Sequence, residues 1–404
     1  MANSLLTISM VTREAVRLFR NSNWFLRTIN RQFDEEFGRG GAKIGSQLRI
    51  RLPNDYTLRT GPTANPQSTN EQSTMLTVAN QYGVDVSFTS ADRALSLDDY
   101  SERVLAPAVN ILAGGVAVAV MANIEQASNF VMNTDASSNM ISPSAGTWLQ
   151  AGAILDRNGA PRNDRFIVLD PITQARTVTS LTGLFNPQAK ISEQYMRGTL
   201  SVDTLGFDWG MDQTVTMHTT GAYGTPPTVS GANQTGSTLT ISALAGPVVA
   251  GDIFTIAGVR AVNRVTKSST GQLQQFTILA NANAGATSLS IYPPITPASG
   301  GNPVPFQTVD VSPAGGANIV FATAASSAYR NNFAYYAEAL TLATAELELP
   351  RGTHEAARET YDGISLRMVT DYAILSDSFV TRLDILFGSL MVRPEWVCKV
   401  ADIP

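Results

Sequence analysis

The sequence contains little of the chemistry on which most enzymes rely. It has one cysteine, Cys398, and two histidines, His218 and His354, among 404 residues. A single cysteine excludes an internal disulfide framework, and the HEAAR run at His354 lacks the second histidine of a zinc-binding HExxH motif. Phosphate-binding loops, nucleophile elbows and dinucleotide-binding patterns are missing too. We therefore expect no enzymatic activity, no catalytic residues, no cofactor and no metal.

We also expect no signal peptide, because no long apolar stretch follows a charged segment in the first residues. One apolar run, residues 104–124, has only Asn110 and Asn123 as polar side chains, and its length alone would allow a membrane span. Pro107 interrupts the run, and its many alanines and glycines contribute little to transfer into lipid. We expect a buried helix and no membrane partner.

Charge is scarce overall and unevenly placed. The net charge is −5, which argues against a basic nucleic-acid-binding protein. The first 60 residues nevertheless carry ten basic side chains against five acidic ones. Such asymmetry suggests that this end contacts something acidic, namely a neighbouring subunit, another partner or a polyanion. An ordinary solvated face is the alternative reading.

The longest segment with a helical pattern is Ser96–Asn133. Ser96 is a candidate N-cap with Asp99 as its capping-box partner, and Asp98 and Glu102 add negative charge where the helix dipole is positive. A helix of this length would span about 55 Å. We interpret it as a spine for several layers, with Ala/Gly-rich residues 113–122 allowing close approach.

Two alternating runs precede this spine, residues 47–58 and 74–89, and they are separated by the polar segment 60–73. The alternation predicts strands, so together they predict a long two-stranded excursion. An isolated hairpin is marginal in water. We therefore expect it to lie on another surface, plausibly that of a second subunit.

A mixed α/β region follows the spine. It includes a short helix that starts near Thr147, a buried strand over 165–169 and a helix over 171–181. After residue 327, residues 328–349 begin with a helical pattern and end with a strand pattern. Residues 364–372 and 378–387 then show strand-like alternation.

Between these parts lies a stretch of different composition. Residues 221–327 carry five charged side chains, Asp252, Arg260, Arg264, Lys267 and Asp310. Short alternating runs such as STLTISAL, DIFTIAGVRAV and TSLSIYP recur between turn signals. This pattern predicts a small all-β barrel or sandwich inserted into the rest of the chain. A low-complexity linker is the alternative, against which the regular apolar alternation argues.

The whole layout resembles the major capsid protein of tailed bacteriophages, the Hong Kong-97 capsid fold. TREAVRLFRNSNWFLRTINRQFDEEF followed by KIGSQLRIRLP is similar to the start of such coat proteins, and RLDILFGSLMVRPEW is similar to their end. VSGA at 229–232 and GDIFTIAGVRAVN at 251–263 resemble the insertion domain of coat proteins from short-tailed phages. The chain departs from that branch where VSGA runs into NQTGSTLTIS without a charged loop. We therefore expect no two-fold contact through such a loop.

The resemblance implies an α+β fold with six parts. These are an N-terminal arm (1–45), an extended β-hairpin loop (46–92), a peripheral domain with the spine helix (93–140), an axial-type α/β domain (141–222), an inserted β-barrel (223–327) and a return to the core with C-terminal strands (328–404).

The implied function is structural. Copies of the chain would form hexamers and pentamers of an icosahedral shell around double-stranded DNA, bound non-specifically. They would assemble in the host bacterial cytoplasm with a scaffolding protein and a portal protein, and with a decoration protein as an optional partner. The precursor shell would then expand. Other β-rich virion components (tail or decoration proteins), a surface adhesin and a cryptic hydrolase are the alternatives.

Two sets of residues are candidates for these roles. The candidates for contacts between subunits are Arg13, Arg17, Trp24, Arg49, Arg51, Arg59 and Glu71. The candidate hinges, where bends would absorb expansion, are Gly38, Gly40, Gly41, Pro107, Gly114 and Gly115.

Overall fold

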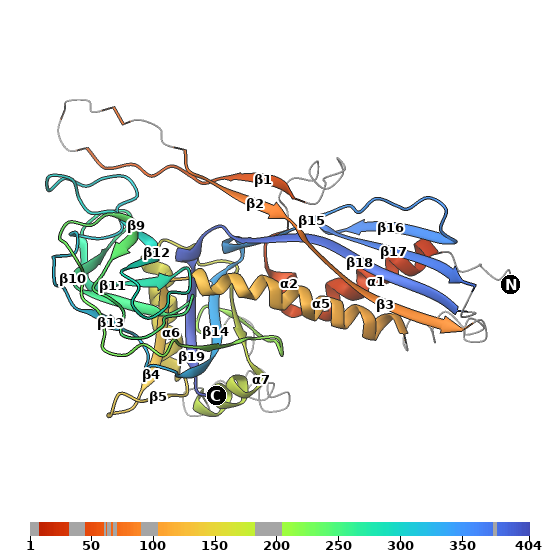
Figure 1. Cartoon of the computed structure of the whole chain (residues 1–404), viewed down its shortest axis with the longest axis horizontal. Coiled ribbons are helices and arrows are strands. Elements are labelled where there is room, and N and C mark those ends of the chain that lie inside the picture. Colours follow the sequence, from red (N-terminus) through yellow and green to blue (C-terminus); the bar gives the residue numbers. More distant parts are fainter. Residues whose placement is uncertain are drawn as a thin grey trace. The chain divides into compact units, whose positions relative to one another are not determined.

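The computed structural model describes residues 8–31, 45–59, 62, 66–67, 71–89, 104–181, 204–374 and 378–404 (Figure 1). The chain divides into two compact units. The first comprises residues 1–50, 73–121 and 340–392, and the second comprises 51–72, 122–339 and 393–404. The predicted helix start at Ser96 and the candidate hinges Gly38, Gly40 and Gly41 lie outside the described residues.

The first unit is built on an antiparallel sheet. Its strands are β3 (Asn80–Thr89), β15 (Leu340–Ala345), β16 (Glu355–Tyr361), β17 (Ile364–Ala373) and β18 (Ser378–Met391). β18 pairs with β3 along one edge and with β17 and then β15 along the other. The strands predicted at 364–372 and 378–387 are confirmed. Asp362 and Gly363, both with positive φ, form the two-residue turn between β16 and β17, a geometry that matches the twist of the strands.

Helix α5 (Ala106–Met121) packs against β3 and against helix α1 (Ile8–Ser22) within this unit (Figure 1). Its buried positions recur every three to four residues, from Ala108 to Met121. Pro107 lies in the first turn, where its missing N–H costs no helical bond. By composition, residues 106–126 would be apolar enough to cross a membrane, but half of that stretch is buried inside the chain.

The prediction of one helix to Asn133 is wrong at its C-terminal end. The α-helix stops at Met121, a 3₁₀ helix η3 (Ala122–Gln126) follows, and strand β4 (Asn129–Thr134) begins three residues later. Residues 129–132 pair in parallel with strand β19 (Val397–Asp402), so the sheet captures backbone groups that the apolar pattern assigned to a helix. The sixteen residues of α5 span about 24 Å.

The N-terminal segment is packed within the first unit over residues 8–31. Helix α1 lies on β16 and β17, and helix α2 (Trp24–Thr28) follows it. The side chains of Phe19, Phe25 and Leu26 are fully buried. Asn30 exchanges two backbone hydrogen bonds with β15, to Leu340 and Leu342, of 3.1 and 3.0 Å. This burial explains the aromatic side chains that the sequence places near its start.

The first strand of the excursion is shorter than the alternating run 47–58 predicts. β1 (Ser46–Arg51) ends before Pro53, and it pairs with β2 (Ser73–Val78) in a two-stranded sheet. The predicted strand 74–89 is two strands, β2 and β3, because Ala79 between them is not part of either strand. β2 therefore pairs with β1, whereas β3 joins the sheet of the first unit.

The second unit contains a mixed seven-stranded sheet in the order β5-β4-β19-β14-β6-β7, with β8 also pairing with β14. The strands not yet bounded are β5 (Met140–Ile141), β6 (Arg165–Leu169), β7 (Asp208–Met211), β8 (Met217–Thr219) and β14 (Ala328–Tyr336). Helix α6 (Ala145–Arg157) packs on β4 and β19, and helix α7 (Pro171–Leu181) packs on α6. The strand predicted at 165–169 and the helix predicted at 171–181 are confirmed.

Residues 328–336 form strand β14 and not the predicted helix. β14 lies in the middle of the sheet between β19 and β6, and most of its residues are buried. A strand that is covered on both faces shows no alternation of apolar and polar residues. Periodicity alone therefore could not distinguish this apolar run from a helix. Two 3₁₀ turns, η4 (Ala337–Ala339) and η5 (Pro394–Trp396), complete the unit.

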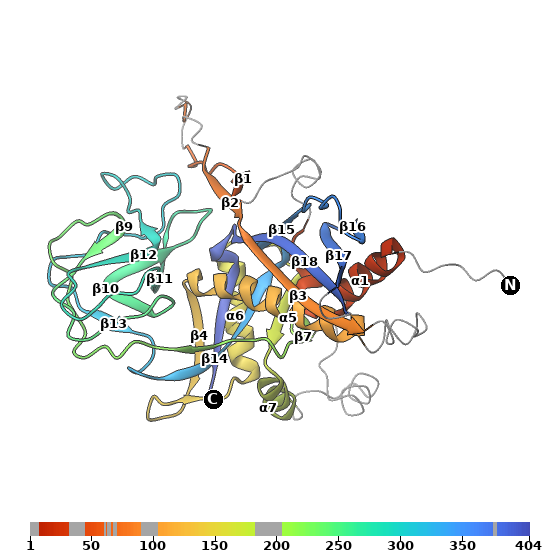
Figure 2. The same cartoon turned by 45° about the vertical axis from the view of Figure 1, so that its right-hand side comes forward.

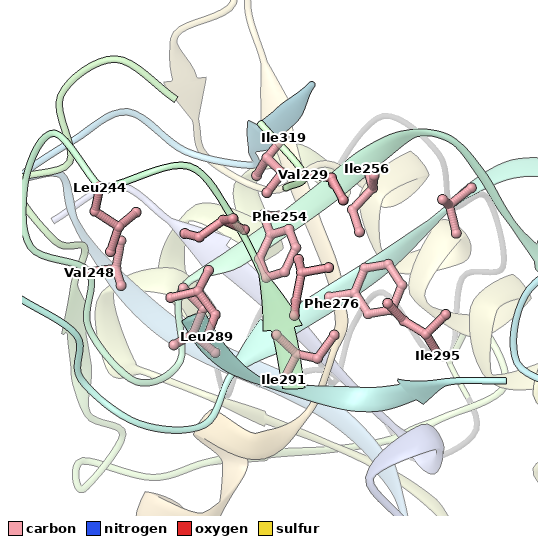
Figure 3. Close-up of a cluster of buried hydrophobic side chains, with 14 of the residues drawn as sticks. Val229, Leu244, Val248, Phe254, Ile256, Phe276, Leu289, Ile291, Ile295 and Ile319 are labelled. Atoms are coloured by element: carbon pink, nitrogen blue, oxygen red, sulfur yellow. The ribbon is translucent and has the colours of Figure 1, made fainter. Parts of the chain in front are cut away.

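The predicted all-β insertion is a barrel. Strands β9 (Gly236–Thr240), β10 (Ile253–Val262), β11 (Ser269–Ile278), β12 (Ser288–Ile295) and β13 (Ile319–Phe321) form a sheet in the order β13-β10-β11-β12-β9. Residues 228 and 229 bridge both edges, to Asn318 and to Ile241, which closes the sheet. Phe254, Ile256 and Phe276 fill the interior together with aliphatic side chains from the other strands (Figure 3).

Both ends of the barrel leave the mixed sheet at the same place. Thr219, at the end of β8, pairs with Ala328, at the start of β14. A segment whose two ends are adjacent can be inserted without disturbing the surrounding sheet. Figure 2 shows β9 to β13 gathered in a separate layer of strands.

One close contact in the first unit gives a test of its packing. Gly83 of β3 pairs with Asp384 of β18, whose buried carboxylate receives Arg367 and Arg382 at 2.6 and 2.7 Å. A Cβ on Gly83 would lie 2.5 Å from Asp384 Oδ1, which belongs to a carboxylate that Arg382 holds through Oδ1 and Arg367 through Oδ2. We expect Gly83→Ala to lower the free energy of unfolding of the first unit by about 2 kcal/mol.

Gly115→Ala is the matched control, because a Cβ there would meet Tyr82 at an ordinary 3.7 Å and alanine favours helix. It should be neutral or stabilising in urea denaturation. Equal stability of Gly83→Ala and the parent chain would contradict this account of the contact.

Candidate functional site

The candidate contact residues on the excursion are exposed and partly brought together. Arg49 donates to the Ser73 hydroxyl at 2.9 Å, across the β1–β2 pair. Arg51 and Glu71 form an ion pair of 3.6 Å, with 71% and 49% of their side chains exposed. Arg59 is also exposed. Exposed pairs of this kind contribute little to the stability of one chain, so these side chains can be used by another surface.

The N-terminal candidates lie on a packed segment. Arg13 is 79% exposed and only 3.9 Å from Glu359, whereas Arg17 pairs with Glu14 one turn away on the same helix. Trp24 is half-buried. The helix therefore presents its arginines outward and buries the opposite face against the sheet.

The candidate hinges within α5 show no bend. Pro107 is exposed at the start of the helix, and Gly114 and Gly115 lie within its continuous α-helical span. The assignment of Pro107, Gly114 and Gly115 as hinges stays a prediction.

Sequence reasoning missed an anchor for the N-terminal segment. Asp362, in the β16–β17 turn, receives Arg20 at 2.8 Å and Arg31 at 2.9 Å. Burial lowers the pKa of Arg31, and the facing Asp362 carboxylate opposes that shift. A Cβ on the adjacent Gly363 would lie 2.6 Å from the Arg31 carbonyl oxygen. The Asp-Gly pair between two alternating runs was the available signal for the turn.

The second unit contains a buried ionic cluster where the barrel meets the mixed sheet. We call it the junction cluster; its charged members are Glu125 (η3), His218 (β8), Asp252 (before β10) and Lys399 (β19). His218 lies between the carboxylates, with Nδ1 3.2 Å from Glu125 and Nε2 3.0 Å from Asp252. Lys399 Nζ donates to the Gly251 carbonyl at 3.0 Å and lies 3.8 Å from Glu125. Asp252 and Lys399 are almost completely buried.

The charges of the junction cluster balance only when His218 is protonated. Two carboxylates then face one ammonium and one imidazolium, and a buried charge is stable only when it is paired. Burial alone would lower the pKa of His218, but hydrogen bonds to Asp252 and Glu125 outweigh it and raise that pKa from 6.5 to about 9. Burial would raise the pKa of Glu125, and His218 and Lys399 hold it below its usual value instead.

Further contacts make the cluster specific for these residues. Asp252 also accepts the backbone N–H groups of Gly221 and Val249, at 3.2 and 2.8 Å. Gly251 has φ of +97°, and a Cβ there would lie 2.1 Å from Glu125. The Gly-Asp pair at 251–252 thus leaves space for one carboxylate and supplies the other.

Contacts between uncharged groups also join the barrel to the mixed-sheet side of the second unit. The side-chain amide of Gln275 in β11 donates to the Phe130 carbonyl and accepts its N–H, both at 2.9 Å, as a neighbouring strand would. Thr277 donates to the Glu125 carbonyl at 2.9 Å. Ile253, Phe130, Tyr329 and Ala401 pack beside them in one apolar cluster.

A second, partly buried carboxylate also joins the barrel to the mixed-sheet side. Glu395 of η5 receives Arg264 of the barrel at 2.5 Å, Arg393 at 3.2 Å and the Tyr292 hydroxyl at 3.1 Å. Burial would raise the pKa of Glu395, but Arg264 holds it below its usual value. The barrel is therefore attached by ion pairs at two separate points.

This arrangement suits attachment and not catalysis. Both ring nitrogens of His218 are occupied by carboxylates, so neither faces an open site. Burial raises the pKa of the Cys398 thiol to about 12, which leaves it protonated and unreactive. Among the described residues, no group of three or more His, Cys, Asp and Glu side chains is arranged to hold a metal ion.

The junction cluster predicts a loss of stability at alkaline pH. Because folding raises the pKa of His218, its stabilisation is complete below pH 6.5 and is lost as the pH rises through 9. We expect the free energy of unfolding to fall by about 3 kcal/mol between pH 6 and pH 10 from this group. Urea denaturation followed by tryptophan fluorescence measures the change.

The two histidines of the chain supply the variant and its control. His218→Gln should remove this part of the pH dependence, whereas His354→Gln, at an exposed position, should retain it. Burial also lowers the pKa of Lys399, which both variants keep, so that contribution cancels in the comparison. The same alkaline slope in parent and His218→Gln would show that the imidazolium does not stabilise the junction.

The family model described as "P22 coat protein - gene protein 5" matches residues 38–238 and 234–399. No curated protein matches the sequence.

Several solved structures from phages are similar to this chain. A structure from Mycobacterium phage Che8 has a TM-score of 0.45 and 11% identity, and the match covers 95% of this chain and 90% of that one. The capsid of cyanophage P-SCSP1u has a TM-score of 0.41 and 10% identity, covering 89% and 84%. The CUS-3 coat protein I-domain is 34% identical, with a TM-score of 0.20, covering 25% of this chain and 98% of that one.

The family model covers well over half of the chain and includes the excursion, α5, the mixed sheet, the whole barrel and nearly all of the C-terminal strands. The chain therefore belongs to the P22 coat protein family, and it is a structural major capsid protein that forms an icosahedral shell and not an enzyme.

Proposed function

We propose that this coat protein builds its shell through the excursion and the N-terminal helix, whose charged side chains contact neighbouring copies in hexamers and pentamers. The carrying observation is that Arg49, Arg51, Arg59 and Glu71 are all exposed on one excursion. Charged groups of the junction cluster, such as Asp252 and Lys399, are by contrast buried and paired within the single chain. Surface charges that a chain does not need for folding favour a role in association.

The assembly route follows from the family and from the charge of the chain. Copies assemble in the host bacterial cytoplasm on a scaffolding protein, with a portal protein, into a precursor shell. That shell expands as double-stranded DNA enters. A net charge of −5 suits a container that binds the packaged DNA only weakly and non-specifically. A decoration protein is an optional addition to the outer surface.

The domain division at residues 45, 92, 140, 222 and 327 describes how we expect these parts to act in the shell. The excursion reaches a neighbour, the barrel stays with the axial-type α/β domain, and expansion is absorbed near Gly38, Gly40, Gly41, Pro107, Gly114 and Gly115. Each contact between copies can be weak, because many act together in a closed shell.

Charge reversal on the excursion tests this proposal. Arg49→Glu and Arg59→Glu should each reduce the yield of closed shells at least fivefold, because each replaces a positive charge that complements the neighbouring copy with a negative one. Both positions are exposed, so the urea stability of the unassembled chain should change by less than about 0.5 kcal/mol. Sedimentation and negative-stain microscopy of chain co-expressed with a scaffolding protein measure the yield.

Arg351→Glu is the matched control, because Arg351 is an exposed arginine in a turn outside the candidate set. It should assemble at the parental yield. Normal shells from both excursion variants would contradict the proposed contact, and monomers or tubes from the parent chain under all conditions would contradict the proposed assembly.

A further inference from the structure

Four of the five charged side chains of the barrel, Asp252, Arg264, Lys267 and Asp310, have a hydrogen-bond or ion-pair partner, and one of these partners lies on the excursion. Asp252 and Arg264 attach the barrel to the mixed-sheet side, at His218 and Glu395. Asp310 accepts the Arg260 N–H at 2.9 Å and the Ser269 hydroxyl at 3.2 Å, within the barrel. Lys267 instead forms its ion pair with Asp55, 212 positions earlier in the sequence.

Asp55 belongs to residues 51–72, which we call the tip of the excursion. The tip and the barrel are parts of the same compact unit. The Asp55 carboxylate receives the Lys267 ammonium and also the Phe306 N–H, at 2.7 Å. The positive charge of Arg264 is close enough for Asp55 to favour it electrostatically. One carboxylate thus pairs with one cation of the barrel, accepts one of its backbone N–H groups and lies within electrostatic range of a second cation.

The Lys267 side chain is buried enough that the pair matters energetically. Only 2% of that side chain is exposed, against 24% for Asp55. If the tip left this position, a shielded ammonium would lose its counter-ion, and an uncompensated buried charge is strongly destabilising. The exposed Arg51–Glu71 pair of the same tip carries no such cost.

The backbone of the barrel is specialised at the same two residues. Lys267 and Phe306 each have φ of +56°, a conformation that side chains of this kind rarely adopt. The turn before Lys267 is fixed by Asn263, which accepts the N–H groups of Val265 and Thr266 at 2.9 and 3.1 Å. Strained non-glycine residues of this sort persist where a specific contact requires them.

We propose that the barrel is the receptor for the tip of its own chain, and that the Asp55–Lys267 pair latches the excursion before assembly. The inserted domain then contributes to assembly without the charged loop that is missing after residues 229–232, because it holds in place the segment that carries Arg51 and Arg59. The latch itself is a property of the single chain. Only its consequence, an excursion already placed for a neighbour, rests on the proposed function.

Limited trypsin digestion of the full-length, unassembled chain tests the latch. Trypsin cleaves after the exposed Arg59, four residues beyond Asp55. Asp55→Asn and Lys267→Met should each speed the appearance of peptides ending at Arg59 at least fivefold, as measured by mass spectrometry. The double variant should be no faster than the faster single variant, because both changes remove one contact.

Glu71→Gln is the matched control, since it removes the other described tip carboxylate and leaves Asp55 in place. Its cleavage rate should stay within twofold of the parent. Circular dichroism identifies any variant whose barrel has not folded, and Asp55→Asn, which changes no barrel residue, decides the question if Lys267→Met fails that check.

The latch would be overturned if Asp55→Asn were cleaved at the same rate as the parent chain. It would also be overturned if the fold-increases in cleavage rate of the two single variants multiplied in the double variant. Protection that appears only at high protein concentration would overturn it as well, because a second copy would then supply Asp55. Shell formation plays no part in these assays, so a failure of the proposed assembly contacts and a failure of the latch give separate results.

Discussion

The attachment of the inserted barrel depends on one buried imidazolium between two carboxylates. His218 comes from the mixed sheet, Asp252 from the barrel and Glu125 from the segment after α5. Lys399 completes the charge balance from the C-terminal strand. Since β8 and β14, which carry the two ends of the insertion, meet beside this cluster, its ion pairs determine how the barrel is connected to the sheet. Removing any one charge would leave the others uncompensated in a dry environment.

The scarcity of charge in the barrel gives this attachment its specificity. A segment with five charged residues among 107 has few ways to pair, and three of the five reach groups outside the barrel: His218, Glu395 and Asp55. The interior needs none of them, because aliphatic and aromatic side chains fill it (Figure 3). Folding of the barrel and its attachment are thus carried by different kinds of interaction. In our proposal this separation lets the shell change its contacts between copies while each barrel stays on its own sheet.

Much of the fold could be predicted where local pattern and tertiary setting agree. Residues 165–169 and 171–181 are bounded by clear turn and proline signals, and their predicted ranges are correct. Apolar and polar residues alternate along the barrel strands because only one face of each strand is buried. Prediction failed where an apolar run fits two structures: residues 129–133 and 328–336 are strands because β19 and its neighbours supply hydrogen-bond partners from distant parts of the chain.

The candidate site was predictable only in part, for a similar reason. Alternation predicted the excursion that carries Arg49, Arg51 and Arg59, and composition and alternation predicted the inserted all-β domain. The partners of His218, Lys267 and Asp362 did not follow, because a single sequence contains no information on which distant charges meet. His218 and Asp252 are 34 positions apart, and Asp55 and Lys267 are 212 apart. Burial of the N-terminal aromatic side chains was not predicted, because the strands on which this segment packs come from the other end of the sequence.

The central claim is that buried charge attaches a barrel that is stable by itself. Native-state hydrogen exchange of Asp252→Asn against the parent chain tests it most directly. The account predicts faster exchange at the boundary, in η3, β8 and the Gly221 and Val249 amides, with protection of β11 and β12 retained by the barrel core. Uniform loss of protection throughout the barrel, or no change at the boundary, would contradict it.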